Sequence, residues 1–258
     1  MCGIFGCALR NGKAAPLIHA ALRRLEYRGY DSVGEATIHD GVLCVKKDQG
    51  KIDDVHRAVD LDEMEGSVGI GHTRWATHGA PYQVNAHPHT DCEGKIAVVH
   101  NGIIENYTEI KKELEGLGHL FKSKTDTEVI PHLVEENMKK GTSLVEAVRE
   151  ALRRLNGSYV IAVISSLEPE KIVVARNESP LVIGVGEGAN YCASDIPAFL
   201  PLTNKTVILE NGELCVLTAE KYEIWSIADW KPVRREPEQV TWTAEMAQKQ
   251  GYPHFMIK

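Results

Sequence analysis

The pattern of hydrophobic and polar positions divides the chain into a β-rich first part, a helical middle and a β-rich last part. Residues 2–9 form a short apolar run without alternation, which is typical of a buried strand. Apolar side chains then recur every three or four residues over 16–25, which predicts a helix with Pro16 in its first turn. Two short runs, 35–39 and 42–46, flank Asp40-Gly41, a pair that favours a type I′ hairpin.

The middle of the chain combines two strands with three helices. Residues 67–71 predict a strand that leads into His72-Thr-Arg-Trp-Ala-Thr-His-Gly79, and residues 95–100 predict another that stops at Asn101-Gly102. A helix is expected from Ile103 to Leu117, with Gly118 as its C-terminal stop. Two further helices are predicted by capping boxes at Thr125–Glu128 and Ser143–Glu146, the first with Pro131 near its first turn.

After Gly157 the chain is mostly β. Short strands are predicted, and two of them, 207–210 and 213–217, flank Asn211-Gly212, a second type I′ hairpin signal. From about Glu236 the chain is polar and without periodicity, which indicates a linker. Strands, then helices, then strands, joined in part by hairpins, favour two antiparallel sheets with helices on their outer faces.

Composition excludes several classes of protein. The chain has 258 residues, of which 43% are hydrophobic and 25% charged, and a net charge of -7, so we expect no nucleic-acid partner. Its longest strongly apolar run, 159–164, is far below the roughly 20 residues of a membrane span. We expect no signal peptide, because Arg10 and Lys13 follow the first apolar segment. A soluble, cytoplasmic protein is therefore expected.

The cysteines and histidines give no recognisable metal pattern. The six cysteines are scattered without a Cys-x-x-Cys pair, which argues against a zinc ribbon and a disulfide framework. His87, His89 and His100 could together bind a metal, but no nearby cysteine or acid completes a recognisable ligand set. Because no phosphate loop or dinucleotide glycine motif is present either, we expect neither a metal nor a cofactor.

Cys2 is the first candidate for chemistry. Removal of Met1 would leave one residue that carries both a thiol and a free α-amine. The α-amine has a reference pKa of about 7.7–8.0, so part of it is neutral at physiological pH and can act as a base for the thiol. Gly3 would leave room for a substrate to approach the backbone. The alternative is that Cys2 is a small residue at the start of a strand.

Three further groups could bind a substrate. Arg74 offers a planar fork that matches a carboxylate, with Thr77 and His78 as additional donors, unless this segment is a polar surface loop with Trp75 packed inward. Asn101 and Gly102 could hold a developing oxyanion, or could form a plain turn. Asp126 could bind an ammonium group, or could only complement a helix N-terminus.

Together these groups suit one kind of substrate. A cationic fork binds an α-carboxylate, an acid binds an α-ammonium, and a nucleophile faces an oxyanion hole. The sequence therefore predicts a site for an amino acid that carries a scissile acyl group in its side chain.

Six motifs lie along the chain: Cys2-Gly3-Ile4, LRRLEYRGYDS at 22–32, HTRWATHG at 72–79, NAHPH at 85–89, VVHNGIIEN at 98–106 and TDTEV at 125–129. With these motifs the chain resembles the class II glutamine amidotransferase domains. More narrowly, it resembles the glutaminase half of the glutamine–fructose-6-phosphate aminotransferases, which form glucosamine 6-phosphate. Related phosphoribosyl-pyrophosphate amidotransferases usually carry Tyr-Ser where this chain has Trp75-Ala76.

The resemblance implies an α+β N-terminal-nucleophile hydrolase fold with four layers, αββα, in which two antiparallel sheets are stacked. It implies that Cys2 attacks the glutamine amide through a γ-glutamyl thioester and that Asn101 and Gly102 hold the oxyanion. Arg74, supported by Thr77 and His78, would bind the α-carboxylate. Asp126 and the Gly102 carbonyl would bind the α-ammonium, and Arg28 and Trp75 would line or close the site.

The resemblance also implies a domain plan and partners. Residues 2–236 would be the glutaminase domain and 237–258 a linker toward a sugar isomerase module that this sequence does not include. Ammonia would pass to that module and convert fructose 6-phosphate to glucosamine 6-phosphate, in a full-length enzyme that forms a homodimer. Two alternatives stay open: a glutaminase that serves another acceptor, and a catalytically silent domain that binds glutamine.

Overall fold

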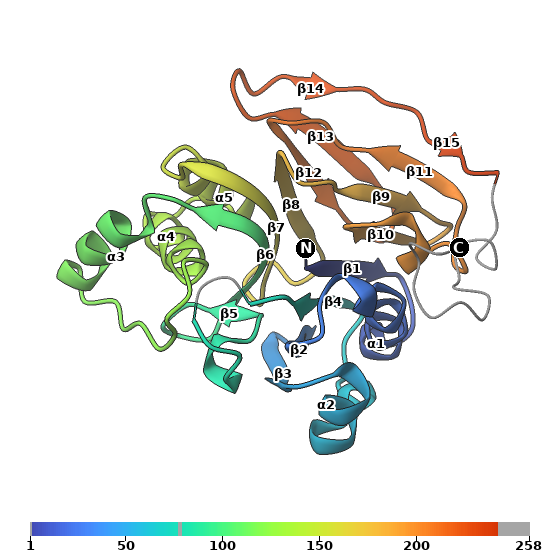
Figure 1. The fold of residues 1–258 in the computed structure, drawn as a ribbon. Helices are drawn as coiled ribbons and strands as arrows, with labels where there is room; N and C mark the ends of the chain where they lie inside the picture. Colours follow the sequence, from blue (N-terminus) through green and yellow to red (C-terminus); the bar gives the residue numbers. More distant parts are fainter. Residues whose placement is uncertain (1, 77–78, 242–258) are drawn as a thin grey trace.

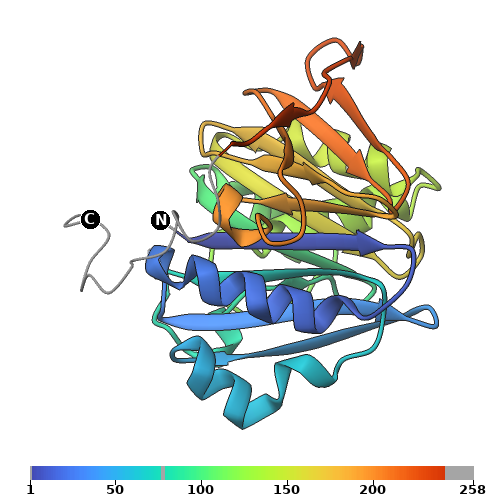
Figure 2. The same ribbon diagram turned by 90° about the vertical axis from the view of Figure 1, so that its right-hand side faces the viewer.

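Two antiparallel β-sheets lie face to face, and helices cover the outer face of each sheet (Figures 1 and 2). The computed structural model describes residues 2–76 and 79–241. The four layers that the sequence predicts are therefore confirmed. Within the described residues, no helix is long and apolar enough to cross a membrane.

The first sheet has eight strands in the order β15-β11-β9-β10-β1-β4-β2-β3. Its central strand β1 pairs with β4 on one side and with β10 on the other. The strands are β1 Gly3–Leu9, β2 Ser32–His39, β3 Val42–Gln49, β4 Val68–Arg74, β9 Val182–Val185, β10 Ala189–Ala193, β11 Lys205–Ile208 and β15 Glu238–Gln239.

The second sheet has seven strands in the order β14-β13-β12-β8-β7-β6-β5. The longest strand pairing in this sheet is that of β6 with β7, which extends along the whole of both strands. The strands are β5 His89–Thr90, β6 Ile96–Ile104, β7 Gly157–Ser165, β8 Ile172–Asn177, β12 Glu213–Leu217, β13 Tyr222–Ser226 and β14 Pro232–Val233.

The helices form the two outer layers. The first sheet is covered by α1 (Ala14–Leu25) and α2 (Ile52–Val59), and the second by α3 (Tyr107–Gly116), α4 (Val129–Met138) and α5 (Leu144–Leu152) (Figures 1 and 2). Short 3-10 helices are at Glu26–Arg28, Leu61–Glu63, Gln83–Asn85 and Ile196–Ala198.

Burial on both faces explains why β1 lacks polar alternation. Ile4 and Ala8 belong to the apolar core between the two sheets, whereas Phe5, Cys7 and Leu9 belong to the core under α1 and α2. A strand whose two faces are both covered has no solvent side for polar residues. A third core lies between the second sheet and its helices.

Several local predictions are confirmed. Asp40 and Gly41 both have positive φ, as a type I′ hairpin between β2 and β3 requires. Ser143 and Glu146 form a complete capping box on α5. Gly118, with φ of +96°, follows the end of α3, and Pro131 lies in the first turn of α4.

Three other local predictions are wrong. Asn211-Gly212 does not close a hairpin, because β11 belongs to the first sheet and β12 to the second. Thr125–Glu128 is not a capping box, since the Glu128 carboxylate accepts backbone N–H groups at 122 and 123 instead. Asn101-Gly102 does not end a strand: β6 continues through both residues to Ile104.

The chain remains part of the first sheet for a few residues beyond 237, the predicted start of the linker. β15 pairs with β11 at Glu238–Gln239, and the Val240 N–H donates to the Asn204 carbonyl. The first residues assigned to a linker from 237 thus add an edge strand. The division into a domain and a linker otherwise stays a prediction.

Candidate active site

Cys2 lies at the N-terminal end of β1, beside the C-terminal end of β4. Gly3 pairs with Thr73 in the β1–β4 register, so Cys2 lies next to the segment that follows Arg74. The Cys2 thiol accepts a hydrogen bond from the Trp75 N–H at 3.1 Å. The backbone carbonyl of Cys2 accepts hydrogen bonds from Arg28 Nε at 3.1 Å and from Asn101 Nδ2 at 2.9 Å. The backbone of the candidate nucleophile is therefore held from two directions.

Opposing effects act on the pKa of the Cys2 thiol. Burial raises the pKa of the Cys2 thiol above its usual value, while the Trp75 N–H and the positive charges of Arg74 and Arg28 act to lower it. The net direction is upward, so the thiol needs a base to become a thiolate. A neutral α-amine on the same residue would meet this need.

Two glycines allow the chain to pass close to Cys2. A Cβ at Gly3 would come within 2.6 Å of Thr73 Oγ1 and 2.8 Å of Leu25 Cβ. A Cβ at Gly29 would come within 2.6 Å of the Arg74 carbonyl carbon and 2.8 Å of the Trp75 nitrogen. Gly3 is thus required for packing, and its role in substrate access stays a prediction. Gly29 leaves space for the peptide whose N–H contacts the thiol.

Asn101 is oriented by a buried histidine. His72 Nε2 lies 2.9 Å from Asn101 Oδ1 and 3.1 Å from the His100 carbonyl oxygen. Burial lowers the pKa of His72 to about 3, so its ring is neutral and Nε2–H is the donor to both oxygens. The Asn101 amide must then direct its NH₂ group toward Cys2. The sequence pattern around His72 does not indicate this role.

Gly102 has a backbone conformation that only glycine adopts easily. Its φ is +135°, and a Cβ there would lie 2.1 Å from the Ser158 carbonyl oxygen. The need for a glycine at this backbone conformation, and not a turn, explains why an Asn-Gly pair lies within β6. The oxyanion and ammonium roles of Gly102 remain predictions.

Opposite charges line the same pocket. Arg74 is buried at the end of β4, and its Nη2 donates to the Gly79 carbonyl at 3.2 Å. Burial lowers the pKa of the Arg74 guanidinium, whereas Cys2, Asp31 and Asp126 act to raise it. Asp126 is buried too, and its Oδ2 accepts the Ile104 N–H at 2.8 Å. Asp126 therefore anchors β6 in addition to facing the pocket.

Trp75 and Arg28 lie at the edge of this pocket. Trp75 is 47% exposed, with its ring 5.4 Å from that of Tyr30 in an edge arrangement, so it is not packed inward. The Ala76 N–H donates to Asp31 Oδ2 at 2.7 Å, which fixes the segment after Trp75. Arg28 also lies 3.4 Å from Asp195 Oδ2 through Nη1. Arg28 thus connects the Cys2 backbone to the segment after β10.

The pocket brings seven of the predicted site residues together. Its empty volume is about 890 Å³, part of which is open to solvent. These seven residues are Cys2, Arg28, Arg74, Trp75, Asn101, Gly102 and Asp126. The other two, Thr77 and His78, lie outside the described residues. Pocket size and charge suit a small zwitterion.

Three buried histidines, His87, His89 and His100, form a neutral layer, and His87 and His100 line the pocket. His87 stacks on His72 with ring centroids 4.2 Å apart, and its Nδ1 accepts the His100 N–H at 3.2 Å. His89 Nε2 lies 3.1 Å from Thr125 Oγ1. Burial lowers the pKa of all three rings. Their ring nitrogens thus contact backbone and hydroxyl groups around the segment that carries Asp126.

Comparison with known proteins agrees with this site. Residues 72–201, half of the chain, match the family described as "Glutamine amidotransferase domain". The chain belongs to this family. The match covers the Arg74, Asn101, Gly102 and Asp126 segments, so the family assignment and the pocket rest on the same part of the chain.

Individual relatives narrow the comparison. The chain is 54% identical to glutamine–fructose-6-phosphate aminotransferase [isomerizing] of Methanothermobacter thermautotrophicus and 52% identical to that of Thermococcus kodakarensis. All of this chain is covered in both comparisons, but only 43% of each relative. The chain thus spans less than half the length of the curated relatives it matches.

Solved structures confirm the fold class. The glutamine phosphoribosylpyrophosphate amidotransferase of Bacillus subtilis matches with a TM-score of 0.75 and 28% identity, over 88% of this chain and 49% of that one. A glutamine aminotransferase class-II domain protein of Silicibacter pomeroyi matches with a TM-score of 0.57 at 13% identity, which supports the fold alone. The α+β fold of N-terminal-nucleophile amidotransferases is therefore established for this member of the family.

Proposed function

We propose that this amidotransferase domain hydrolyses L-glutamine to glutamate and ammonia, with Cys2 as the nucleophile. One observation carries the proposal: the Cys2 thiol, the Asn101 amide and the charged pair Arg74 and Asp126 line one pocket. A glutamine molecule bound by its α-carboxylate at Arg74 and its α-ammonium at Asp126 would direct its side-chain amide into the remaining space near Cys2.

The reaction would proceed in two steps. The α-amine of Cys2, freed by removal of Met1, accepts the thiol proton, directly or through a water, and the thiolate attacks the amide carbon. Asn101 Nδ2–H and the Gly102 N–H stabilise the oxyanion. The carbon–nitrogen bond breaks, ammonia leaves with the proton, and a γ-glutamyl thioester remains. Water then hydrolyses the thioester, which releases glutamate and restores the thiol.

The remaining site residues would orient and enclose the substrate. Thr77 and His78 would add donors to the α-carboxylate beside Arg74, and the Gly102 carbonyl would accept from the α-ammonium. Trp75, exposed at the edge of the pocket, would cover the bound substrate. Arg28 acts on the Cys2 backbone, where it donates to the carbonyl.

The ammonia would serve amino-sugar synthesis. Relatives at 54% and 52% identity are named for fructose 6-phosphate and isomerisation, whereas the phosphoribosylpyrophosphate enzyme is 28% identical. We therefore favour fructose 6-phosphate as the acceptor, on an isomerase module, within a homodimeric enzyme of the cytoplasm. Phosphoribosyl pyrophosphate is the alternative acceptor.

Glutamate release from glutamine tests the chemistry. The protein is first shown by intact mass to have lost Met1. We expect release that is absent in Cys2→Ala and unchanged in Cys44→Ser, a matched control because Cys44 is a half-buried free thiol on β3. Glutamine analogues without the α-carboxylate or the α-ammonium should lose about 10- to 100-fold in kcat/KM, since each removes a charge-assisted contact.

Two outcomes would redirect the proposal. Glutamine that binds to correctly processed protein but is never hydrolysed would indicate a silent binding domain. Release that persists in Cys2→Ala would exclude Cys2 as the nucleophile. The acceptor is tested separately by supplying an isomerase module and comparing amination of fructose 6-phosphate with that of phosphoribosyl pyrophosphate.

A further inference from the structure

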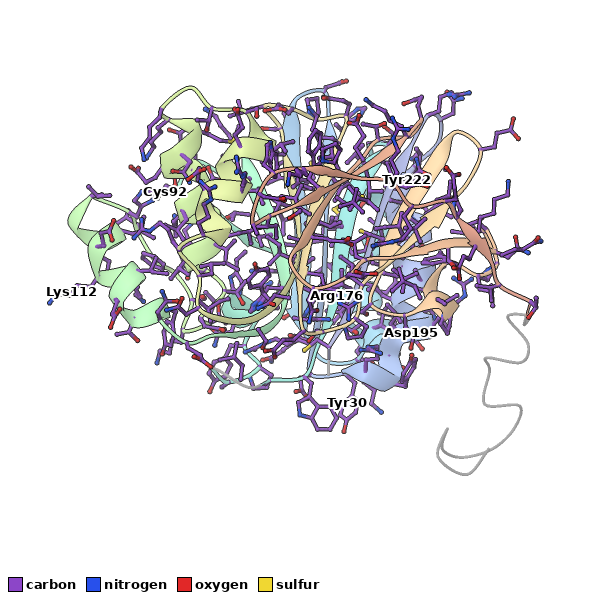
Figure 3. All side chains as sticks on the ribbon, turned by 90° about the horizontal axis from the view of Figure 1, so that it is seen from above. Tyr30, Cys92, Lys112, Arg176, Asp195 and Tyr222 are labelled. Atoms are coloured by element: carbon purple, nitrogen blue, oxygen red, sulfur yellow. The ribbon has the colours of Figure 1, made fainter. Side chains whose placement is uncertain are left out.

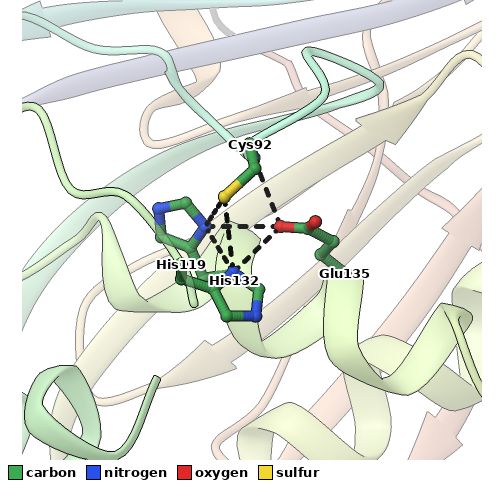
Figure 4. Close-up of side chains that lie close together, drawn as sticks. All are labelled: Cys92, His119, His132 and Glu135. Carbon is green, nitrogen blue, oxygen red and sulfur yellow. Dashed lines mark hydrogen bonds and ion pairs between the residues drawn. The ribbon is translucent and has the colours of Figure 1, made fainter. Parts of the chain in front are cut away.

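A second group of reactive side chains lies outside the pocket. Cys92, His119, His132 and Glu135 converge from three segments of the second sheet and its helices (Figure 4). Cys92 is in the turn between β5 and β6, His119 follows α3, and the other two residues are on α4. In Figure 3, Cys92 lies well apart from Tyr30, whose ring centroid is 5.4 Å from that of the pocket residue Trp75. None of the four residues lines the pocket.

The four candidate ligand atoms are mutually close. His119 Nδ1 lies 3.1 Å from both His132 Nδ1 and Glu135 Oε2, and His132 Nδ1 lies 3.4 Å from Glu135 Oε2. Cys92 Sγ lies 3.5 Å from His119 Nδ1 and 3.6 Å from His132 Nδ1. Tetrahedron edges of this size put its centre about 1.9–2.2 Å from each corner, near the metal–ligand lengths of about 2.0–2.3 Å for zinc.

A carboxylate behind His119 directs one of its lone pairs inward. His119 Nε2 lies 2.8 Å from Glu136 Oε1, which holds the proton on Nε2, so His119 Nδ1 presents a lone pair to the cluster. His132 Nε2 has no hydrogen-bond partner among the described residues, and Glu128 Oε1 lies 3.9 Å from it. Two ring nitrogens and a carboxylate oxygen within 3.1–3.4 Å of one another form a donor set that a cation would stabilise.

The surrounding structure also fixes the ligands in place. Lys139 Nζ pairs with Glu135 Oε1 at 2.9 Å, which leaves Oε2 for the cluster. His119 is positioned by the end of α3: its N–H donates to the Leu114 carbonyl, and the Gly118 N–H donates to the Glu115 carbonyl. This is a Schellman motif. Asp91 Oδ1 accepts two N–H groups of the Cys92 turn, at 95 and 96.

From this geometry we propose that Cys92, His119, His132 and Glu135 bind a structural Zn²⁺ ion. One thiolate, two imidazoles and one carboxylate are borderline donors that suit zinc, and four protein ligands leave no position for a substrate. The His19, His56 and Asp62 group is weaker, because the two rings stack with centroids 4.3 Å apart and only three ligands are present.

The ion would stabilise the part of the site that binds the substrate ammonium. His119 and His132 bracket residues 120–131, which include Asp126 and have little regular structure before α4. A metal bond at each end, and a third to the turn before β6, would hold this segment against the strand that carries Asn101. The ion would thus act on substrate binding through position and not through chemistry.

Metal analysis of the full chain, without a polyhistidine tag, tests the proposal. Protein produced with zinc in the medium should contain about one Zn²⁺ per chain, and Cys92→Ser and His119→Gln should each lose at least about 10-fold in metal affinity. Cys44→Ser and His39→Gln are matched controls that should keep the ion. Cys2→Ala should keep it too, which excludes chelation by an N-terminal cysteine.

A second measurement needs no variant that could fail to fold. Apoprotein titrated with Co²⁺ should develop a thiolate-to-cobalt charge-transfer band at one equivalent, in wild type and in Cys2→Ala alike, and chelation of the ion should lower the thermal midpoint. The proposal is overturned if wild type holds no zinc and develops no such band. It is also overturned if folded Cys92→Ser and His119→Gln bind metal as wild type does. In that case hydrogen bonds among the four side chains account for the cluster.

Discussion

Cys2 and Cys92 are both free cysteines near the surface, but their surroundings are opposite in kind. The sulfur of Cys2 faces an N–H donor and lies near two guanidinium groups, and it opens onto a pocket. The sulfur of Cys92 faces two imidazole nitrogens, with a carboxylate beside them. Donors and cations favour a thiolate that attacks a substrate, whereas converging lone pairs favour a thiolate that binds a metal.

The histidines of the two regions differ in the same way. Around Cys2, the ring nitrogens of His72 and His87 contact an amide oxygen, a carbonyl and a backbone N–H. Around Cys92, the Nδ1 atoms of His119 and His132 point at one another. The number of histidines is therefore a poor guide to metal binding. The direction in which their ring nitrogens point is the better guide.

The largest expected effect separates the two cysteines directly. Cys2→Ala should lower kcat for glutamate release by about 10³-fold or more, because the covalent route is lost. Cys92→Ser should keep the covalent route and instead lower the thermal midpoint. Steady-state kinetics and thermal melts on both variants check this. A loss of activity in Cys92→Ser as large as that in Cys2→Ala, with the protein still folded, would break the comparison.

Removal of the oxyanion donor should have the next largest effect. Asn101→Ala removes the amide that contacts the Cys2 carbonyl at 2.9 Å and would face the oxyanion. We expect kcat to fall about 10²- to 10³-fold with a smaller change in KM, because the donor acts mainly in the transition state. Equal binding of a glutamine analogue by the variant and wild type is the control. A change confined to KM would contradict the assigned role.

His72 should have a smaller, indirect effect on kcat. His72→Leu removes the Nε2–H donor that orients Asn101, which is 2.9 Å away. We expect kcat to fall about 10-fold, roughly the 1.4 kcal/mol of one positioning hydrogen bond. His72→Gln can restore an N–H donor and should recover part of the loss. If Leu and Gln are equally impaired at equal thermal stability, His72 does not act through Asn101.

The neutral histidines also predict a pH dependence of stability. The folded-state pKa of His72 is lowered to about 3, against about 6.5 in an unfolded chain. Between these two pKa values the His72 ring binds a proton only in the unfolded state. The free energy of unfolding of the protein therefore falls by about 1.4 kcal/mol per pH unit as pH decreases. Urea unfolding of wild type and His72→Leu between pH 7 and 4 isolates this contribution. Parallel pH profiles for the two proteins would contradict it.

The sequence alone determined much of the fold class and of the active site. Apolar runs and helical spacing depend on local geometry, so β1, α1 and α5 were predicted correctly. The chemistry of the residue types predicted a nucleophile, a cationic fork and an acid, and the three residues concerned, Cys2, Arg74 and Asp126, line one pocket. Their exact contacts, such as that of His72 with Asn101, did not follow from the pattern.

Only the tertiary structure decided which distant segments meet. Asn-Gly and Asp-Gly are similar local signals, yet Asp40-Gly41 closes a hairpin and Asn211-Gly212 joins strands of different sheets. Cys92, His119 and the His132–Glu135 pair are likewise separated along the chain, although the i, i+3 spacing on α4 was visible. Local patterns report the periodicity of one element, whereas sheet membership and converging side chains depend on the packing of the whole chain.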